Sequence, residues 1–207
     1  MTTIEKSAGQ PNWIGDMTSE PILVILHGIP GSGKTFFANS LKDQMLKDSK
    51  NEWIFVCQND LGKRSKCEKL CMEALCAGKR VVIDRCNADE NQRLTWIKAA
   101  RDYWPYEIPH SSPIWCISFN THFDRCVERI KANPNHPTVS PEDAEKICAC
   151  QAKEITPPQL NEGISCICNV NENDPLFIKE LVYRLKGPLH PILHTSLKTV
   201  AVNNKIG

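Results

Sequence analysis

Residues 22–35 read ILVILHGIPGSGKT, and this stretch decides the fold. An apolar run of strand length leads into a glycine-rich turn that ends in Lys34 and Thr35, which matches the pattern GxxxxGK[ST]. Glycines let the backbone curl until successive N–H groups point at one centre, and a helix that begins there adds its positive end. A strand pattern before the turn and helix-forming residues after it favour a phosphate-binding loop over an ordinary glycine-rich turn.

The predicted nucleotide-binding residues follow one another along this loop. Lys34 can neutralise the β- and γ-phosphate oxygens, and Thr35 can offer its hydroxyl to Mg²⁺. The complete predicted set is Gly28, Ile29, Pro30, Gly31, Ser32, Gly33, Lys34, Thr35 and Phe36.

Length and charge limit the class of protein. A chain of 207 residues suits one α/β domain with short extensions. With 25 Lys+Arg against 24 Asp+Glu, the net charge of +1 gives the whole molecule no strong attraction for polyanions. Any contact with nucleic acid must therefore use a local patch.

The cysteines and the apolar runs indicate the compartment. The 11 cysteines are scattered beside a nucleotide loop, which is typical of reduced intracellular thiols and not of a disulfide framework. The first residues contain no apolar core of a signal peptide, and no apolar run is long enough to span a bilayer. We expect an intracellular protein without membrane contact, in the cytoplasm, the nucleus or both.

Strand and helix patterns alternate along the chain, which predicts an α/β fold. The expected architecture is a P-loop NTPase-type parallel sheet of about five strands flanked by helices, with a helical lid. We expect an N-terminal arm over residues 1–20, the P-loop domain over 21–187 and a C-terminal tail over 188–207. The expected strands are residues 22–26, 53–56, 80–84, 114–119 and 163–168, and the expected helices include 35–47, 67–77, 90–101, 141–153 and 175–185.

The lid is expected from a helix, a proline-rich turn and a second helix after the fourth strand. The first of these helices carries Arg125 and Arg129 four residues apart, and Asn120 or Thr121 can cap it. Phosphoryl transfer needs positive charge on the transferring group, so at least one arginine is a candidate catalytic residue. The alternative is that both arginines belong to a solvated helix face.

Two carboxylates follow expected strands at the edge where parallel sheets bind ligands. Asp84 ends the third strand, where P-loop proteins commonly place a ligand for Mg²⁺ or water, and its alternative role is that of a turn residue. Asp60 follows the second strand, and it could equally cap a helix that begins near Lys63. Near the N-terminus, packing on the domain is favoured over partner binding for Trp13 and Ile14.

Several motifs in a fixed order resemble the kinase domain of the polynucleotide 5′-hydroxyl kinases, an AAA-like family of ATP-binding kinases. After the phosphate loop come NDLG at residues 59–62, AGKRVVIDRCNAD at 77–89 and QRxxW at 92–96, with HPT at 136–138. The phosphate loop is shared by many families, whereas the other segments are more specific. The resemblance covers residues 21–154.

This resemblance implies an ATP- and Mg²⁺-dependent kinase, with the 5′-hydroxyl end of DNA or RNA as the acceptor and DNA repair as the setting. It implies that Asp60 is the general base and that Asp84 helps to hold substrate or metal. Either Arg125 or Arg129 looks like the lid arginine. Arg85 stands where a positive side chain could meet the acceptor or a phosphate.

The chain departs from the family pattern at two places. Asn59 stands where the family usually has a basic residue, and a second lid arginine near Ala132 or Asn133 is absent. Two alternatives therefore stay open beside the polynucleotide kinase. One is a kinase that phosphorylates a small hydroxyl metabolite, and the other is a nucleotide-binding module without catalysis.

Overall fold

The computed structural model describes residues 12–45, 53–106, 113–171, 181 and 185. The predicted helix over residues 175–185 and the predicted tail lie outside these residues, apart from the two single positions. In chain order the elements are β1 (Asn12–Gly15), β2 (Leu23–His27), α1 (Lys34–Met45), β3 (Trp53–Cys57), α2 (Gln58–Leu61), α3 (Arg64–Cys76), β4 (Arg80–Asp84), α4 (Glu90–Tyr103), β5 (Ile114–Phe119), α5 (Phe123–Lys131), α6 (Ala144–Glu154), the 3₁₀ turn η1 (Leu160–Glu162) and β6 (Cys166–Val170).

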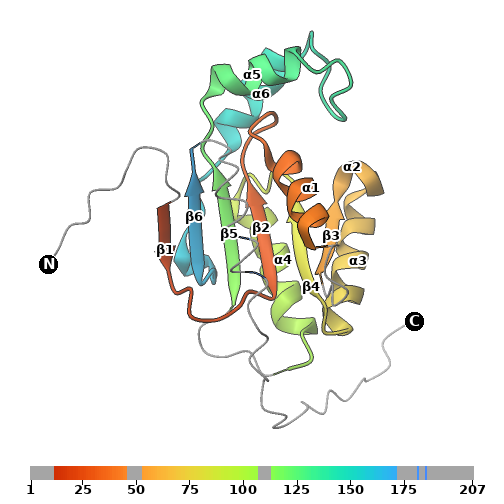
Figure 1. Ribbon diagram of the computed structural model, residues 1–207, viewed down its shortest axis with the longest axis vertical. Helices are drawn as coiled ribbons and strands as arrows, with labels where there is room; N and C mark the ends of the chain where they lie inside the picture. The colour runs from red at the N-terminus through yellow and green to blue at the C-terminus, as the bar shows by residue number, and fades with distance from the viewer. Residues whose placement is uncertain (1–11, 46–52, 107–112, 172–180, 182–184, 186–207) are drawn as a thin grey trace, which may run out of the picture.

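The strands form one six-stranded sheet in the order β1-β6-β5-β2-β4-β3. Five strands are parallel and correspond to the five that the sequence predicted, so the predicted α/β fold is confirmed. The sixth strand, β1, was not expected, and it pairs antiparallel with β6 at the edge of the sheet. Figure 1 shows the sheet with helices packed against it.

The central strand β2 is buried on both faces because its side chains alternate between two cores. Val24 and Leu26 pack in the cluster that contains Phe37 of α1. Leu23 and Ile25 pack in the other cluster, with side chains of α3 and α4. A strand covered on both faces is apolar throughout, which explains the uninterrupted run before the phosphate loop.

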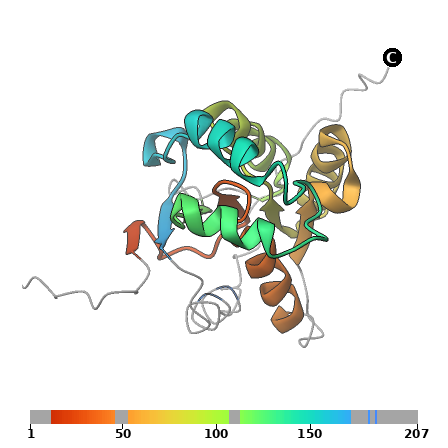
Figure 2. The same ribbon diagram turned by 90° about the horizontal axis from the view of Figure 1, so that it is seen from above.

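Helices α5 and α6 lie over the carboxyl ends of the strands, where the lid was expected (Figures 1 and 2). They share a small apolar cluster with Ile29 of the phosphate loop. Helix α6 begins at Ala144 and not at residue 141, because residues 141–143 form a turn. The predicted cap of α5 is wrong: the helix begins after His122, and the Thr121 hydroxyl instead donates to the Ser32 carbonyl at 2.9 Å.

Strand β1 carries the two apolar residues whose role was open. Trp13 packs on the first core, and its ring lies edge-on to Trp115 with 5.5 Å between the centroids, so the expected packing is confirmed for this side chain. Ile14 remains exposed at 43 %. Within the described part of the chain, no helix has the length and apolar character needed to cross a membrane.

Candidate functional site

The phosphate loop follows β2 and contains glycines that no residue with a Cβ atom could replace. Gly28 has φ = 146° and Gly31 has φ = 76°, both in the region that favours glycine. A Cβ atom on Gly28 would lie 2.7 Å from the Ser32 hydroxyl and 2.9 Å from the Phe119 carbonyl. A Cβ atom on Gly31 would collide with the Cys126 carbonyl of α5, so the lid helix packs directly against the loop.

Lys34, the first residue of α1, is bound to the phosphate loop through its ammonium group. Its ammonium group donates to the carbonyls of Gly28 at 2.7 Å and Ile29 at 2.8 Å, and lies 3.4 Å from the Ser32 hydroxyl. The side chain is 7 % exposed. A buried ammonium group whose hydrogen bonds go only to neutral oxygens is suited to bind an anion that enters the loop.

Six of the nine predicted nucleotide-binding residues line an open cleft, while Gly28, Ile29 and Ser32 lie beneath it. The six are Pro30, Gly31, Gly33, Lys34, Thr35 and Phe36. Phe36 is 63 % exposed, so a large apolar side chain stands at the rim.

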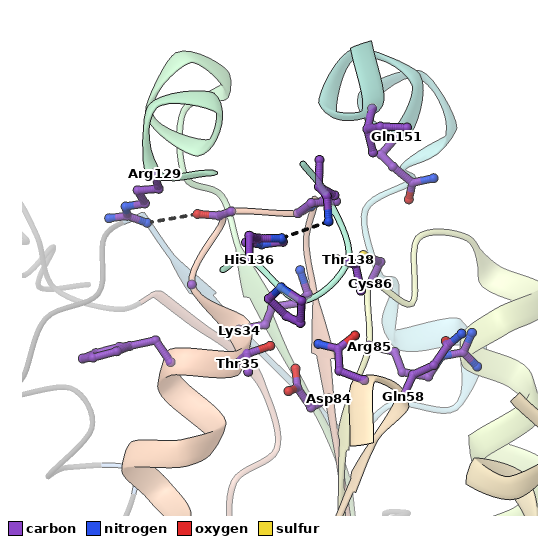
Figure 3. A pocket seen from close by; sticks show the side chains of 18 of the residues that line it. Lys34, Thr35, Gln58, Asp84, Arg85, Cys86, Arg129, His136, Thr138 and Gln151 are labelled. Carbon is purple, nitrogen blue, oxygen red and sulfur yellow. Dashed lines mark hydrogen bonds between the residues drawn. The ribbon is translucent and has the colours of Figure 1, made fainter. Parts of the chain in front are cut away.

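Thr35 and Asp84 lie side by side next to Lys34 (Figure 3). Burial raises the pKa of the Asp84 carboxyl, while its interaction with the Thr35 hydroxyl and the charge of Lys34 oppose that rise. A carboxylate and a hydroxyl are hard oxygen ligands, which is the donor set that Mg²⁺ prefers. The two residues predicted to bind metal therefore fit that role in chemistry and in place.

The two candidate arginines of α5 point to different surroundings. Arg129 lines the cleft, and its guanidinium lies 3.4 Å from the carbonyls of Gly31 and of Ser32 (Figure 3). Arg125 is exposed and pairs with Glu128 at 3.2 Å. Of the two candidates for the lid arginine, only Arg129 therefore faces the phosphate loop.

Asp60 lies in the short helix α2 at the end of β3. Its side chain is exposed and does not line the cleft, whereas Gln58 and Asn59 do. The alternative role as a helix cap is wrong, because the residue before α3 is Lys63. Asp60 is still close enough for its charge to raise the pKa of Asp84.

The β4–α4 loop is held to the phosphate loop from behind. The Gly28 amide donates to the Cys86 carbonyl at 3.2 Å. The side-chain amide of Asn87 donates from Nδ2 to the Leu26 carbonyl at 2.7 Å, and its Oδ1 accepts from the Trp96 indole at 2.9 Å. These contacts hold Asn87 in a left-handed conformation with φ = 46°.

Arg93 anchors the same loop from inside α4. Its guanidinium makes two bonds of 2.7 Å to Glu162 and donates to the carbonyls of Asn87, Ala88 and Thr156. Both partners of the ion pair are buried. Arg93 and Trp96 of the motif QRxxW therefore support the loop that begins with Arg85 after β4, a role that the spacing of the motif did not indicate.

The cleft between the phosphate loop and the lid has a volume of about 820 Å³. Besides the loop it is lined by polar side chains from α2, the β4–α4 loop, α4, the connection between α5 and α6, and α6. They include Gln58, Asn59, Arg85, Gln92, Asn133, His136, Thr138 and Gln151. Figure 3 labels five of them, Gln58, Arg85, His136, Thr138 and Gln151. This volume is large enough for two small reactants side by side.

His136 was singled out only as part of the HPT segment, and the structure places it over Lys34 (Figure 3). Its Nδ1 accepts the Val139 amide at 3.2 Å, so the proton of the neutral ring sits on Nε2. Burial and the charge of Lys34 lower the pKa of His136. The lid therefore brings a neutral hydrogen-bond donor to the phosphate side of the cleft.

Comparison with known proteins places the chain in a family. The family described as "AAA domain" matches residues 23–152, so the chain belongs to this family of P-loop kinase domains. The matched residues contain the phosphate loop, Asp60, Asp84 and both candidate arginines.

Curated relatives match over shorter segments. The chain is 36 % identical over 98 residues to "Transcription factor bHLH140" of Arabidopsis thaliana, which covers 45 % of this chain and 10 % of that protein. It is 38 % identical over 87 residues to "Bifunctional polynucleotide phosphatase/kinase" of Schizosaccharomyces pombe, covering 42 % and 19 %. The chain thus matches only a fifth or less of these relatives, and the predicted resemblance to polynucleotide kinases is confirmed at this partial coverage.

A solved structure shows the same fold. Kti12 of Chaetomium thermophilum, crystallised with ADP-AlF3, superposes with a TM-score of 0.55 at 16 % identity, covering 79 % of this chain and 96 % of that one. At this identity the likeness shows the fold alone.

Proposed function

We propose that this chain is an Mg²⁺-dependent kinase that transfers the γ-phosphate of ATP to a hydroxyl group, the 5′-hydroxyl end of DNA or RNA. The proposal rests on one cleft that contains both a phosphate-binding part and room for a second reactant. Lys34, Thr35, Asp84 and Arg129 gather at the phosphate loop, and polar side chains leave room beside them for a second reactant. The partial match to a polynucleotide kinase supports the choice of acceptor.

The phosphate loop binds the nucleotide. Backbone N–H groups and the end of α1 hold phosphate oxygens, and Lys34 exchanges its bonds to the Gly28 and Ile29 carbonyls for bonds to phosphate. Thr35 and Asp84 would hold Mg²⁺, which when bound neutralises phosphate charge. The contacts of Arg129 to loop carbonyls are long, so its guanidinium is free to turn to the transferring group.

In the transfer step the acceptor oxygen forms a bond to the γ-phosphorus as the bond from that phosphorus to the β–γ bridging oxygen breaks, and ADP leaves. Asp60 takes the hydroxyl proton. Its neighbours Gln58 and Asn59 line the cleft and its charge acts on Asp84, which supports a position near the acceptor. Positioning and charge stabilisation supply most of the catalysis in such reactions.

The test is transfer from γ-labelled ATP with Mg²⁺ to short 5′-hydroxyl oligonucleotides, DNA and RNA in parallel. Label should appear on the oligonucleotide and should disappear with Lys34→Ala. Retention of end-labelling by Asp60→Asn would exclude Asp60 as the base. ATP binding without transfer to any acceptor would instead indicate a module without catalysis, an alternative that the exposure of Asp60 favours.

A small hydroxyl metabolite is the second candidate acceptor. Neutral amides such as Gln58, Asn59 and Gln151 line the cleft, which suits a small polar molecule. Salt distinguishes the two acceptors, because a protein that contacts several phosphates loses affinity steeply as salt rises and one that binds a neutral metabolite does not.

A further inference from the structure

Of the cysteines that the structure describes, only Cys86 lines the cleft. It lies in the β4–α4 loop and is half-buried, and Figure 3 shows its side chain at the wall of the cleft. Its backbone carbonyl accepts the Gly28 amide at 3.2 Å, so this residue lies directly against the phosphate loop. Reactive cysteines are typically partly exposed and close to basic side chains, and a charge on Cys86 acts on the adjacent Arg85.

Cys148 approaches the same part of the phosphate loop from the lid. It lies in α6 and is fully buried, and its Sγ atom is 3.7 Å from the Pro30 carbonyl, two residues after Gly28. Burial raises the pKa of the Cys148 thiol, the charge of Lys34 opposes this rise, and a charge on Cys86 adds to it. The two cysteines therefore lie against residues 28–30 of the loop, one from the edge of the sheet and one from the lid.

The lid is already attached to the β4–α4 loop at one end. The Thr156 amide, just after α6, donates to the Ala88 carbonyl at 2.8 Å. Cys148 lies eight residues before Thr156, about two helical turns nearer the start of α6. A bond from Cys148 to Cys86 would be a second attachment to the same loop. A helix attached at two points cannot swing away from the phosphate loop, whereas a helix attached at one end can.

We propose that Cys86 and Cys148 are a redox-sensitive pair, which forms a disulfide bond under oxidation by a peroxide and thereby locks the lid onto the phosphate loop. Both thiols are free in the structure, which is the reduced state. The inference goes beyond the proposed function, because it does not depend on which hydroxyl accepts the phosphate or on whether transfer occurs.

The reaction has two steps. The Cys86 sulfur attacks one oxygen of hydrogen peroxide, so that an S–O bond forms, the O–O bond breaks and one water leaves with the thiol proton. The Cys148 sulfur then attacks the Cys86 sulfenic acid, so that the S–S bond forms, the S–O bond breaks and the second thiol proton leaves in another water. The two thiols lose two electrons in total, and the peroxide gains them.

The first test is chemical and needs no variant. The full chain is treated with hydrogen peroxide, its remaining thiols are alkylated, and its disulfides are located by peptide mapping without a reductant. A peptide that joins Cys86 to Cys148 should appear, and dithiothreitol should remove it. An ATP analogue bound in the cleft beforehand should slow its formation, because Cys86 lines the same cleft.

The second test measures the lid. Stopped-flow rates of entry and release of a fluorescent ATP analogue should fall by about tenfold or more after peroxide treatment, because lid motion controls access to such sites. Dithiothreitol should restore the rates. In Cys86→Ser and Cys148→Ala the rates should not respond to peroxide. The matched control is Cys150→Ser, which removes an exposed thiol two residues further along α6 and should respond as the unmodified protein does.

Three results would overturn the proposal. The first is the absence of the joined peptide at peroxide concentrations that already oxidise the exposed thiols of Cys76 and Cys150. The second is a set of nucleotide rates that does not change once the disulfide has formed. The third is a peroxide response of these rates that survives in Cys86→Ser. The first two need only the unmodified protein, so the test stays decisive even where a variant does not fold.

Discussion

Two arginines on one short stretch of chain, Arg93 and Arg85, have opposite surroundings. Arg93 is buried behind the β4–α4 loop, and all its nitrogens are bound to Glu162 or to backbone carbonyls. Arg85 belongs to that loop and lines the cleft, with its guanidinium over the Trp96 ring and no polar side-chain partner among the described residues. The difference shows that this motif has a supporting side and a side that lines the cleft. We call the supporting side, formed by the buried pair of Arg93 and Glu162, the foundation.

The largest expected effect is on the foundation. Glu162→Gln leaves the buried Arg93 charge without its counter-ion, and breaking a buried ion pair in this way lowers the free energy of unfolding by about 3–5 kcal/mol. Urea denaturation measures it. The control is Glu68→Gln at the exposed pair with Arg64, where the expected loss is at most about 1 kcal/mol. Equal losses in the two variants would mean that the buried pair of Arg93 and Glu162 stabilises the fold no more than the exposed pair does.

A substitution in the cleft should lower activity without lowering the free energy of unfolding. Asp84→Asn should lower kcat/KM for transfer by about 10²- to 10³-fold, the usual cost of losing one preorganised charge-stabilising group. It should also stabilise the ligand-free protein at neutral pH. Burial raises the pKa of Asp84, so the folded protein holds this proton more strongly than the unfolded chain and is destabilised once the carboxyl ionises.

The stability gain in Asp84→Asn therefore grows as the pH rises through the pKa range of the carboxyl and vanishes in acid. Urea denaturation of both proteins at acid and neutral pH checks the sign. A loss of stability as large as that of Glu162→Gln would place Asp84 in the foundation.

Helix α5 repeats the comparison on a smaller scale. Arg129→Gln should reduce kcat/KM for ATP by roughly 10- to 100-fold, because Arg129 faces the phosphate loop and hydrogen bonds to charged groups have that value. Arg125→Gln should cost less than about threefold, since exposed ion pairs contribute little. Steady-state kinetics on both variants decides it, and the opposite order would make Arg125 the arginine that closes on ATP.

The last prediction concerns the pH dependence of stability and His27, the last residue of β2. Burial, with the charges of Arg93 and Lys34, lowers its pKa to about 3. The unfolded chain takes up a proton below pH 6.5 and the folded protein does not, so stability falls with acid by up to about 1.4 kcal/mol per pH unit. In His27→Gln the free energy of unfolding should fall less steeply between pH 6 and 4, by about 1.4 kcal/mol per pH unit, the contribution of one proton. An unchanged slope would show that His27 is not held neutral by the fold.

Sequence patterns were sufficient for the parallel sheet and the lid because these depend on long apolar runs and helical spacing. Strand β1 was not predicted because its four residues, which end in Gly15, are too few to show an alternation of apolar and polar side chains. Only the pairing with β6 makes them a strand. The short helix α2 escaped because NDLG also fits a turn.

The candidate site was predictable where the chemistry is local, as in the loop with Lys34 and Thr35. Spacing could not separate Arg125 from Arg129, since residues four apart share a helix face and only the packing of α5 on Gly31 directs one of them inward. It also could not separate Arg85 from Arg93. Their roles differ because Glu162, far along the chain, folds back onto one of them and not the other.

Strand β1 has a practical consequence for producing the protein. The family match ends at residue 152, so a chain trimmed to it would lose β1 and β6. Strand β5, whose six residues are all buried, would then become an open edge with an apolar surface. Such edges pair with other chains, so the trimmed protein should aggregate where the longer one, capped by four residues of β1, stays dispersed.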